Sequence, residues 1–206
     1  MAEKIEQYEI FIGSPSGLDR EREKLREEVT FYNTHEVEPE GISFKVKDWK
    51  DIAPSYQNSQ ELIDPYLCVC DFYILVLHNR WGTPPDGDSR YSSGSEHEFH
   101  LAHTCKKSEE HPMQDIAIFF KKMTPNERRR KEGKKVNAFM KKIVESKRLH
   151  FQIFNNIDEF HYCIRKCLAK WRLKIIGYKR LPKPPENVRD FFEDKDLSEM
   201  DEARKT

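Results

Sequence analysis

The chain has 206 residues, a length typical of one domain or of one domain with an extension. Apolar residues make up 37% of it and aromatic residues 12%, which is enough for one packed core and argues against global disorder. Lysine plus arginine equals aspartate plus glutamate, at 36 each, so the net charge gives no reason to expect nucleic acid as a partner.

The sequence shows no signal peptide and no apolar run of transmembrane length, so we expect a cytoplasmic protein without a membrane partner. Its five cysteines are an odd number, and their spacing matches neither a disulfide framework nor a zinc site. We interpret them as reduced thiols, and we expect no metal and no cofactor. They are Cys68, Cys70, Cys105, Cys163 and Cys167.

The first half of the chain alternates between strand and helix patterns. A short apolar run predicts a strand over Tyr8–Gly13, which a Ser-Pro-Ser-Gly turn ends. Helix-forming residues follow over 19–33. The alternating run Ile42–Trp49 predicts a half-buried strand, and residues 59–67 predict a short helix that Pro65 interrupts.

The strongest strand pattern is Asp71–His78, which is apolar almost throughout, as in a central parallel strand covered on both faces. A long loop rich in Gly, Pro and Ser leads from it to a helix over Ser95–Cys105. Another buried strand is predicted over Asp115–Lys121.

A basic helix is predicted over 126–146. Its basic residues lack interleaved aromatic side chains, so we interpret this segment as a solvated surface and do not expect it to bind nucleic acid. A short strand over 149–154 and an amphipathic helix over 157–176 follow.

Five strands alternating with helices predict an α/β three-layer fold with a five-stranded parallel sheet, which we expect over residues 1–176. Residues 177–206 are charged and contain prolines, which indicates a linker or tail. In such sheets, ligands bind beyond the carboxyl ends of the strands. The segments 13–22, 48–55 and 78–96 follow the first three strands, so we expect them to converge on one cleft.

Residues 91–103 contain two glutamates and three histidines, and they come close to the zinc-protease motif His-Glu-x-x-His. The second histidine, however, comes one residue too early. On a wheel with about 100° per residue, His100 and His103 fall on the polar face with Glu96. Glu98 points instead along the apolar face, so we prefer solvated histidines to a metal site.

An inward carboxylate near the start of a helix has two explanations. One is structural: Ser95 is the N-cap and Glu98 is the third helical residue of a capping box. The other is functional: a partly desolvated carboxylate at the mouth of the cleft stabilises a developing cation or activates water. The two explanations are compatible.

The loop after the first strand lacks the Lys-Ser/Thr pair of a Walker A motif, which argues against ATP hydrolysis. Ser14, Ser16 and the start of the next helix could still hold a phosphate or a ribose, and Arg22 could reach the cleft. The alternative is an ordinary turn with Asp19 as the N-cap.

Two tryptophans, Trp49 and Trp81, flank the same predicted crevice. Each lies in a loop, where its ring either stacks on a base or pins the loop to the body of the domain. The sequence leaves both readings open.

Taken in order, these segments resemble a TIR-like family, catalogued as a domain of unknown function, that stands at the N-terminus of STAND/NACHT-type NTPases. The similarity covers residues 7–175, although Gly13 stands where the family often has serine. The matching motifs are Phe11-Ile12-Gly13-Ser14, Glu21-Arg22, Arg80-Trp81-Gly82, and Ser93 through Glu98-Phe99 to Ala102.

The resemblance implies a flavodoxin-like fold related to TIR NADases and to nucleoside deoxyribosyltransferases. It implies that Glu98 is catalytic and that NAD is a substrate rather than a cofactor, with nicotinamide released. The residues expected to bind substrate are Ser14, Ser16, Arg22, Trp49, Arg80, Trp81 and Ser93.

The resemblance also implies partners: further copies of the chain in the active state, and an NTPase or sensor domain attached to it. Two alternatives remain open from the sequence. The chain could be a non-enzymatic module that self-associates for signalling, or an N-glycosidase that acts on nucleosides or nucleotides.

Overall fold

The structure is a computed structural model that describes residues 5–52, 59–85, 90–146 and 149–177. The chain divides into two compact units, Met1–Arg172 and Leu173–Thr206. The first unit holds the whole sheet. Apart from Gly177, the tail predicted over 177–206 lies outside the described residues.

Five strands form one sheet in which every neighbouring pair is parallel, as predicted. Their order is β2-β1-β3-β4-β5, the order of flavodoxin-like doubly wound folds. The strands are β1 (Glu6–Gly13), β2 (Ile42–Lys47), β3 (Phe72–Leu77), β4 (Asp115–Lys121) and β5 (Phe151–Phe154).

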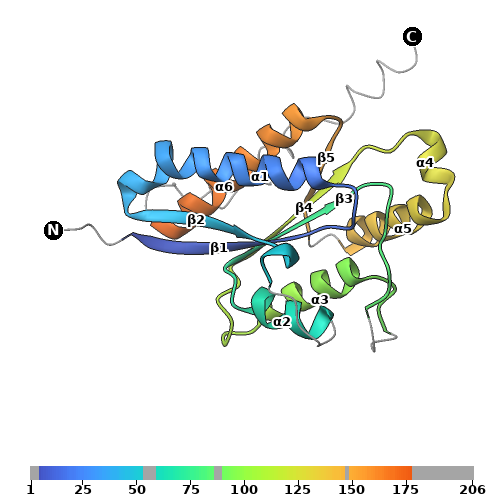
Figure 1. Ribbon diagram of the computed structural model, residues 1–206, viewed down its shortest axis with the longest axis horizontal. Coiled ribbons are helices and arrows are strands. Elements are labelled where there is room, and N and C mark those ends of the chain that lie inside the picture. The colour runs from blue at the N-terminus through green and yellow to red at the C-terminus, as the bar shows by residue number, and fades with distance from the viewer. Residues whose placement is uncertain (1–4, 53–58, 86–89, 147–148, 178–206) are drawn as a thin grey trace, which may run out of the picture. The chain divides into compact units, whose positions relative to one another are not determined.

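Helices cover both faces of this sheet, which gives the three layers (Figure 1). The α-helices are α1 (Asp19–Tyr32), α2 (Ser59–Cys68), α3 (Gly94–Lys107), α4 (Pro125–Arg129), α5 (Lys131–Ser146) and α6 (Ile157–Ile176). Short helical turns are η1 (Asn33–Val37), η2 (Glu38–Glu40) and η3 (Trp49–Asp51).

The alternation of side chains along β3 shows how the two faces are filled. Phe72 stacks on Trp171 of α6, with ring centroids 4.3 Å apart. Tyr73 points to the other face, into a core cluster with residues of α2, α3 and α5 such as Leu67, Phe99 and Phe139. Because both faces are covered, all six residues of β3 are buried.

Three local predictions are wrong. Helix α2 continues through Pro65, which lies within its ten residues. The predicted basic helix is two helices, because the backbone of Arg130 is extended between α4 and α5. Helix α1 begins at Asp19 itself, and the residue in the N-cap position is Leu18, which makes no side-chain cap. No helix of the described residues is long and apolar enough to cross a membrane.

Candidate functional site

The chain changes direction across the sheet between β1 and β3. After β1 it builds β2 on one side, and it then crosses to build β3 on the other side. In open α/β sheets the ligand crevice lies at this switch point, beyond the carboxyl ends of the two strands. Gly13, the last residue of β1, is in register with Leu75 of β3, so it lies where this rule places a ligand.

Two residues from separate elements meet at Gly13. A Cβ atom built on this glycine would lie 2.2 Å from the Tyr73 hydroxyl of β3 and 2.5 Å from Glu98 Oε2 of α3. Tyr73 is fully buried, and Glu98 is 7% exposed. Neither the Tyr73 hydroxyl nor Glu98 Oε2 has a hydrogen-bond partner among the described residues. A buried carboxyl group with an unsatisfied oxygen is costly, so this position is a candidate for function.

Burial raises the pKa of Glu98 to about 8, and the negative charge of Asp64 acts in the same direction. The Tyr73 hydroxyl stabilises the ionised carboxylate and therefore acts to lower this pKa. Its position relative to Oε2 does not meet the full geometry of a hydrogen bond. Asp64 lies on α2, where it contacts His97 Nε2 at 2.9 Å. At neutral pH the buried Glu98 is therefore mostly protonated.

The predicted cap of α3 is wrong. The N-cap is Ser93, whose hydroxyl accepts a hydrogen bond from the backbone N–H of Glu96 at 3.1 Å. The Glu96 carboxylate in turn accepts hydrogen bonds from the backbone N–H and the hydroxyl of Ser92. Ser93 therefore caps α3, Glu96 binds the residue before the cap, and Glu98 takes no part in capping.

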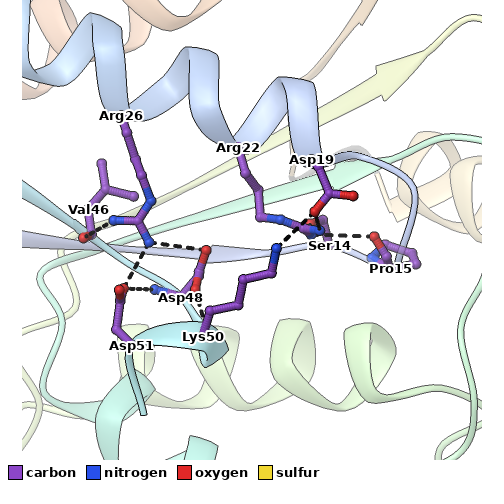
Figure 2. Close-up of polar contacts among 9 residues, drawn as sticks. All are labelled: Ser14, Pro15, Asp19, Arg22, Arg26, Val46, Asp48, Lys50 and Asp51. Carbon is purple, nitrogen blue, oxygen red and sulfur yellow. Dashed lines mark hydrogen bonds and ion pairs between the residues drawn. The ribbon is translucent and has the colours of Figure 1, made fainter. Parts of the chain in front are cut away.

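Arg22 of α1 reaches back over the end of β1, where Figure 2 shows its contacts. Its guanidinium donates to the Ser14 hydroxyl and, at 2.9 Å, to the carboxylate of Asp19. Arg22 is 5% exposed, and its Nε has no hydrogen-bond partner among the described residues. Lys50 also contacts Asp19, at 2.9 Å. The contact with Ser14 brings Arg22 to the loop after β1; its part in binding a ligand stays a prediction.

A second arginine of α1 binds the end of β2. Arg26 donates to the carbonyl oxygen of Val46 at 3.1 Å, and its Nη2 lies 2.9 Å from Asp51 and 3.1 Å from Asp48 (Figure 2). Asp48 is 2% exposed and caps η3. Since Arg26 is held by two carboxylates, it fixes the segment after β2 against α1.

Arg80 and Ser16 come from different loops and lie together. Arg80 donates to the Ser16 hydroxyl at 2.8 Å. Gly17 follows Ser16, and its φ of 91° falls in the left-handed region that favours glycine. The side chain of Arg80 lies 3.7 Å from the position where a Cβ of Gly17 would be. The loops after β1 and β3 therefore lie together, which is one part of the predicted convergence of three loops on a cleft.

The two tryptophans differ in their surroundings. Trp81 is 3% exposed and packs against Phe139, with ring centroids 5.2 Å apart, while its indole N–H donates to the Ser92 hydroxyl. It pins the loop after β3 to the body of the domain. Trp49 is 49% exposed, and the ammonium group of Lys50 lies 5.8 Å from the centroid of its ring. Ser93 is completely buried as the cap of α3.

The site thus combines a buried carboxylic acid, a tyrosine hydroxyl and a buried guanidinium around the end of β1. The guanidinium suits a phosphate or another anion, and the acid suits a developing positive charge or a proton transfer. Sequence reasoning missed Tyr73 and the space that Gly13 provides. The signal for Tyr73 was a hydroxyl within an otherwise apolar strand, where it needs a partner.

Comparisons with known proteins give a family and a distant likeness. The model of a family described as "Domain of unknown function (DUF4062)" matches residues 9–169. None of the curated proteins matches the chain. Among solved structures, the chain is similar to translation elongation factor SelB from Methanococcus maripaludis in its apo form, at 15% identity and a TM-score of 0.41. The match covers 84% of this chain and 34% of that chain, so this chain spans about a third of that protein.

Proposed function

We propose the function of this chain from its candidate site. The chain belongs to the family described as a domain of unknown function (DUF4062), and that description assigns no reaction. We propose that it is a TIR-like NAD-cleaving domain that hydrolyses the N-glycosidic bond and releases nicotinamide. The observation that carries the proposal is Glu98, a buried carboxyl group with an unpartnered oxygen at the switch point between β1 and β3.

The reaction moves positive charge onto the sugar. As the bond between the ribose and the nicotinamide nitrogen breaks, its electron pair stays on the nitrogen, and the ribosyl carbon becomes cationic. Ionised Glu98 stabilises this developing cation more strongly than it stabilises bound NAD before the bond breaks. Water then adds to the carbon and loses a proton to solvent, which leaves ADP-ribose.

Ionisation of Glu98 links the reaction to the opening of the site. Without substrate, burial raises the pKa of Glu98 to about 8, so its carboxyl group is mostly neutral at pH 7. Entry of substrate and water reduces the cost of the charge, and the guanidinium of Arg22 then holds phosphate oxygens in place of its contact with Ser14. Substrate binding therefore generates the ionised carboxylate that the reaction needs.

The other predicted substrate-binding residues take supporting roles in this proposal. Ser14 and Ser16 offer hydroxyls to the phosphates or the ribose, and Arg80, which already binds Ser16, supplies a second cation. Exposed Trp49 stacks on a base. The remaining two, Trp81 and Ser93, keep the loop after β3 and the start of α3 in position.

The proposal extends to partners. The chain is active as a homo-oligomer, and an NTPase or sensor domain linked to it brings the copies together in the cytoplasm in response to infection. Assays therefore need conditions that promote self-association as well as dilute protein.

The test is release of nicotinamide from NAD by purified protein, followed by chromatography at high protein concentration. We expect turnover by the wild type and a loss of about 10²- to 10³-fold in Glu98→Gln, the size of effect seen when one charge-stabilising group is removed. The control is Glu96→Gln, two residues earlier on the same helix, which should keep its rate. Equal losses in the two variants would reject the role of Glu98.

The pH profile separates the rival reactions. Stabilisation of a cation needs ionised Glu98, so kcat/KM on NAD should rise with pH up to about 8, the pKa of the buried acid. A nucleoside N-glycosidase that uses Glu98 to protonate the leaving base would instead lose activity as pH rises through the same range. Absence of base release from NAD, nucleosides and nucleotides by the self-associated protein would favour the non-enzymatic signalling module.

A further inference from the structure

A cluster of three metal-ligating side chains lies apart from the residues of the candidate site. Cys68 is the last residue of α2, Cys105 lies in the last turn of α3, and His111 follows α3. The two sulfur atoms are 3.1 Å apart, and both lie within 4.8 Å of a ring nitrogen of His111. Cys105 is 1% exposed, and the other two residues are half-buried.

The geometry is close to what a tetrahedral cation requires. With metal–sulfur bonds of about 2.3 Å and metal–nitrogen bonds of about 2.0 Å, tetrahedral angles place the sulfurs about 3.8 Å apart and each sulfur about 3.5 Å from the nitrogen. The sulfurs would have to separate by less than about 1 Å, and the ring nitrogen would have to approach them by at most about 1.3 Å.

A disulfide is the competing explanation for two neighbouring cysteines. It would require the sulfurs to approach to about 2.05 Å. A disulfide has no use for an imidazole, whereas the third ligand of a thiolate metal site is commonly a histidine. The position of His111 beside both thiols therefore favours a metal over a sulfur–sulfur bond.

We propose that Cys68, Cys105 and His111 bind one thiophilic divalent cation of the zinc class, and that water occupies its fourth position. On binding, the two thiols release their protons to solvent, and the cation takes both thiolates and a ring nitrogen as ligands. The site ties the end of α2 to the end of α3. This inference does not depend on the proposed reaction at Glu98.

The test is a titration of the full chain with Co²⁺ as a spectroscopic substitute for zinc, after treatment with a chelator and a phosphine reductant. We expect one cobalt per chain with thiolate-to-cobalt charge-transfer absorption, displacement by an equal amount of Zn²⁺, and a rise in Tm with either metal. Cys105→Ser should abolish the charge-transfer band. His111→Ala changes a half-buried residue outside the helices and should weaken cobalt binding by at least about 10-fold.

Cys163→Ser is the matched control, because it removes a half-buried cysteine from α6 rather than from the cluster. It should bind cobalt like the wild type. A wild-type spectrum without thiolate charge transfer, or the same spectrum in Cys105→Ser, would overturn the proposal. So would a protein that forms a Cys68–Cys105 disulfide in air and binds no metal once reduced.

Discussion

Gly13 is a glycine because of space rather than backbone conformation. It is not among the glycines with positive φ, yet a Cβ on it would overlap the Tyr73 hydroxyl and Glu98 Oε2. The resemblance to the TIR-like family leads one to expect serine at this position. The structure gives a reason for the difference, because a larger residue would displace the acid and the phenol from their present positions.

Gly13→Ala should lower the free energy of unfolding by about 1–3 kcal/mol, the usual cost of overpacking a buried site. Chemical denaturation measures this loss. The nearest atom to the new methyl group is the Tyr73 hydroxyl oxygen, so adding Tyr73→Phe to the variant should recover part of the loss. Gly94→Ala is the control, since its nearest neighbour, Gln60 Oε1, is 3.5 Å away. Equal losses for the two glycines would contradict this explanation.

The buried acid also predicts how stability changes with pH. The pKa of Glu98 is about 8 in the folded chain and about 4.3 in an unfolded one, so between these values the folded state binds the extra proton. The stability of the wild type relative to Glu98→Gln should therefore be greatest below about pH 4.3 and fall as pH rises through 8. The full change is on the order of a few kcal/mol.

Denaturant titrations of both proteins between pH 4 and pH 9 measure this difference, and other titrating groups largely cancel in the comparison. A difference that does not change with pH would show that Glu98 ionises freely in the folded protein.

At the level of single residues, the sequence predicted which glutamate of α3 is buried, because the two glutamates fall on different faces of the helix. Glu98 was separated from Glu96 by the periodicity of the helix alone, and the structure places it on the buried side. The cap could not be assigned with the same certainty, because three serines lie within four residues and each can begin a helix. Tyr73 was missed because its contacts come from elements distant in the sequence.

Among the elements, α6 shows that a local sequence pattern can predict both the bounds of a helix and its buried face. The helix was predicted over 157–176 and has these bounds. Four of its residues are buried and form the apolar side that an amphipathic pattern predicts. The buried residues are Phe160, Ile164, Leu168 and Trp171. Where tertiary contacts override local preference, as at Pro65 of α2, the sequence pattern was misleading.

Trp171→Ala should be strongly destabilising, by about 3–5 kcal/mol. The ring is completely buried, stacks on Phe72 and donates its N–H to Asp115 at 3.1 Å, so its loss leaves a cavity and removes one hydrogen bond from a carboxylate that keeps its contact with Lys170. Thermal or chemical denaturation measures the effect. Tyr162→Ala on the same helix is the control, since this side chain is 65% exposed and should cost well under 1 kcal/mol. Similar losses in both variants would mean that α6 is not held to the sheet through Trp171.

For the whole molecule, the alternation of strands and helices was enough to predict the three-layer parallel fold, and the structure confirms it. The order of the strands was not predictable in the same way. It depends on which side of β1 each crossover passes, and no local pattern of residues records this. The positions of Glu98, Tyr73 and Gly13 beside one another depend on that order, so the sequence could indicate the acid without indicating its surroundings.

The strand order also governs the sequence of events while the chain is being synthesised. β1 leaves the ribosome before the other four strands of this sheet, yet it lies inside the sheet and needs a neighbour on each side. Residues 42–47 supply one neighbour, but the other, residues 72–77, emerges much later. Until then the nascent chain exposes an apolar strand with an unpaired edge, a target for chaperones or for pairing with another chain. The crevice cannot exist before that edge is closed.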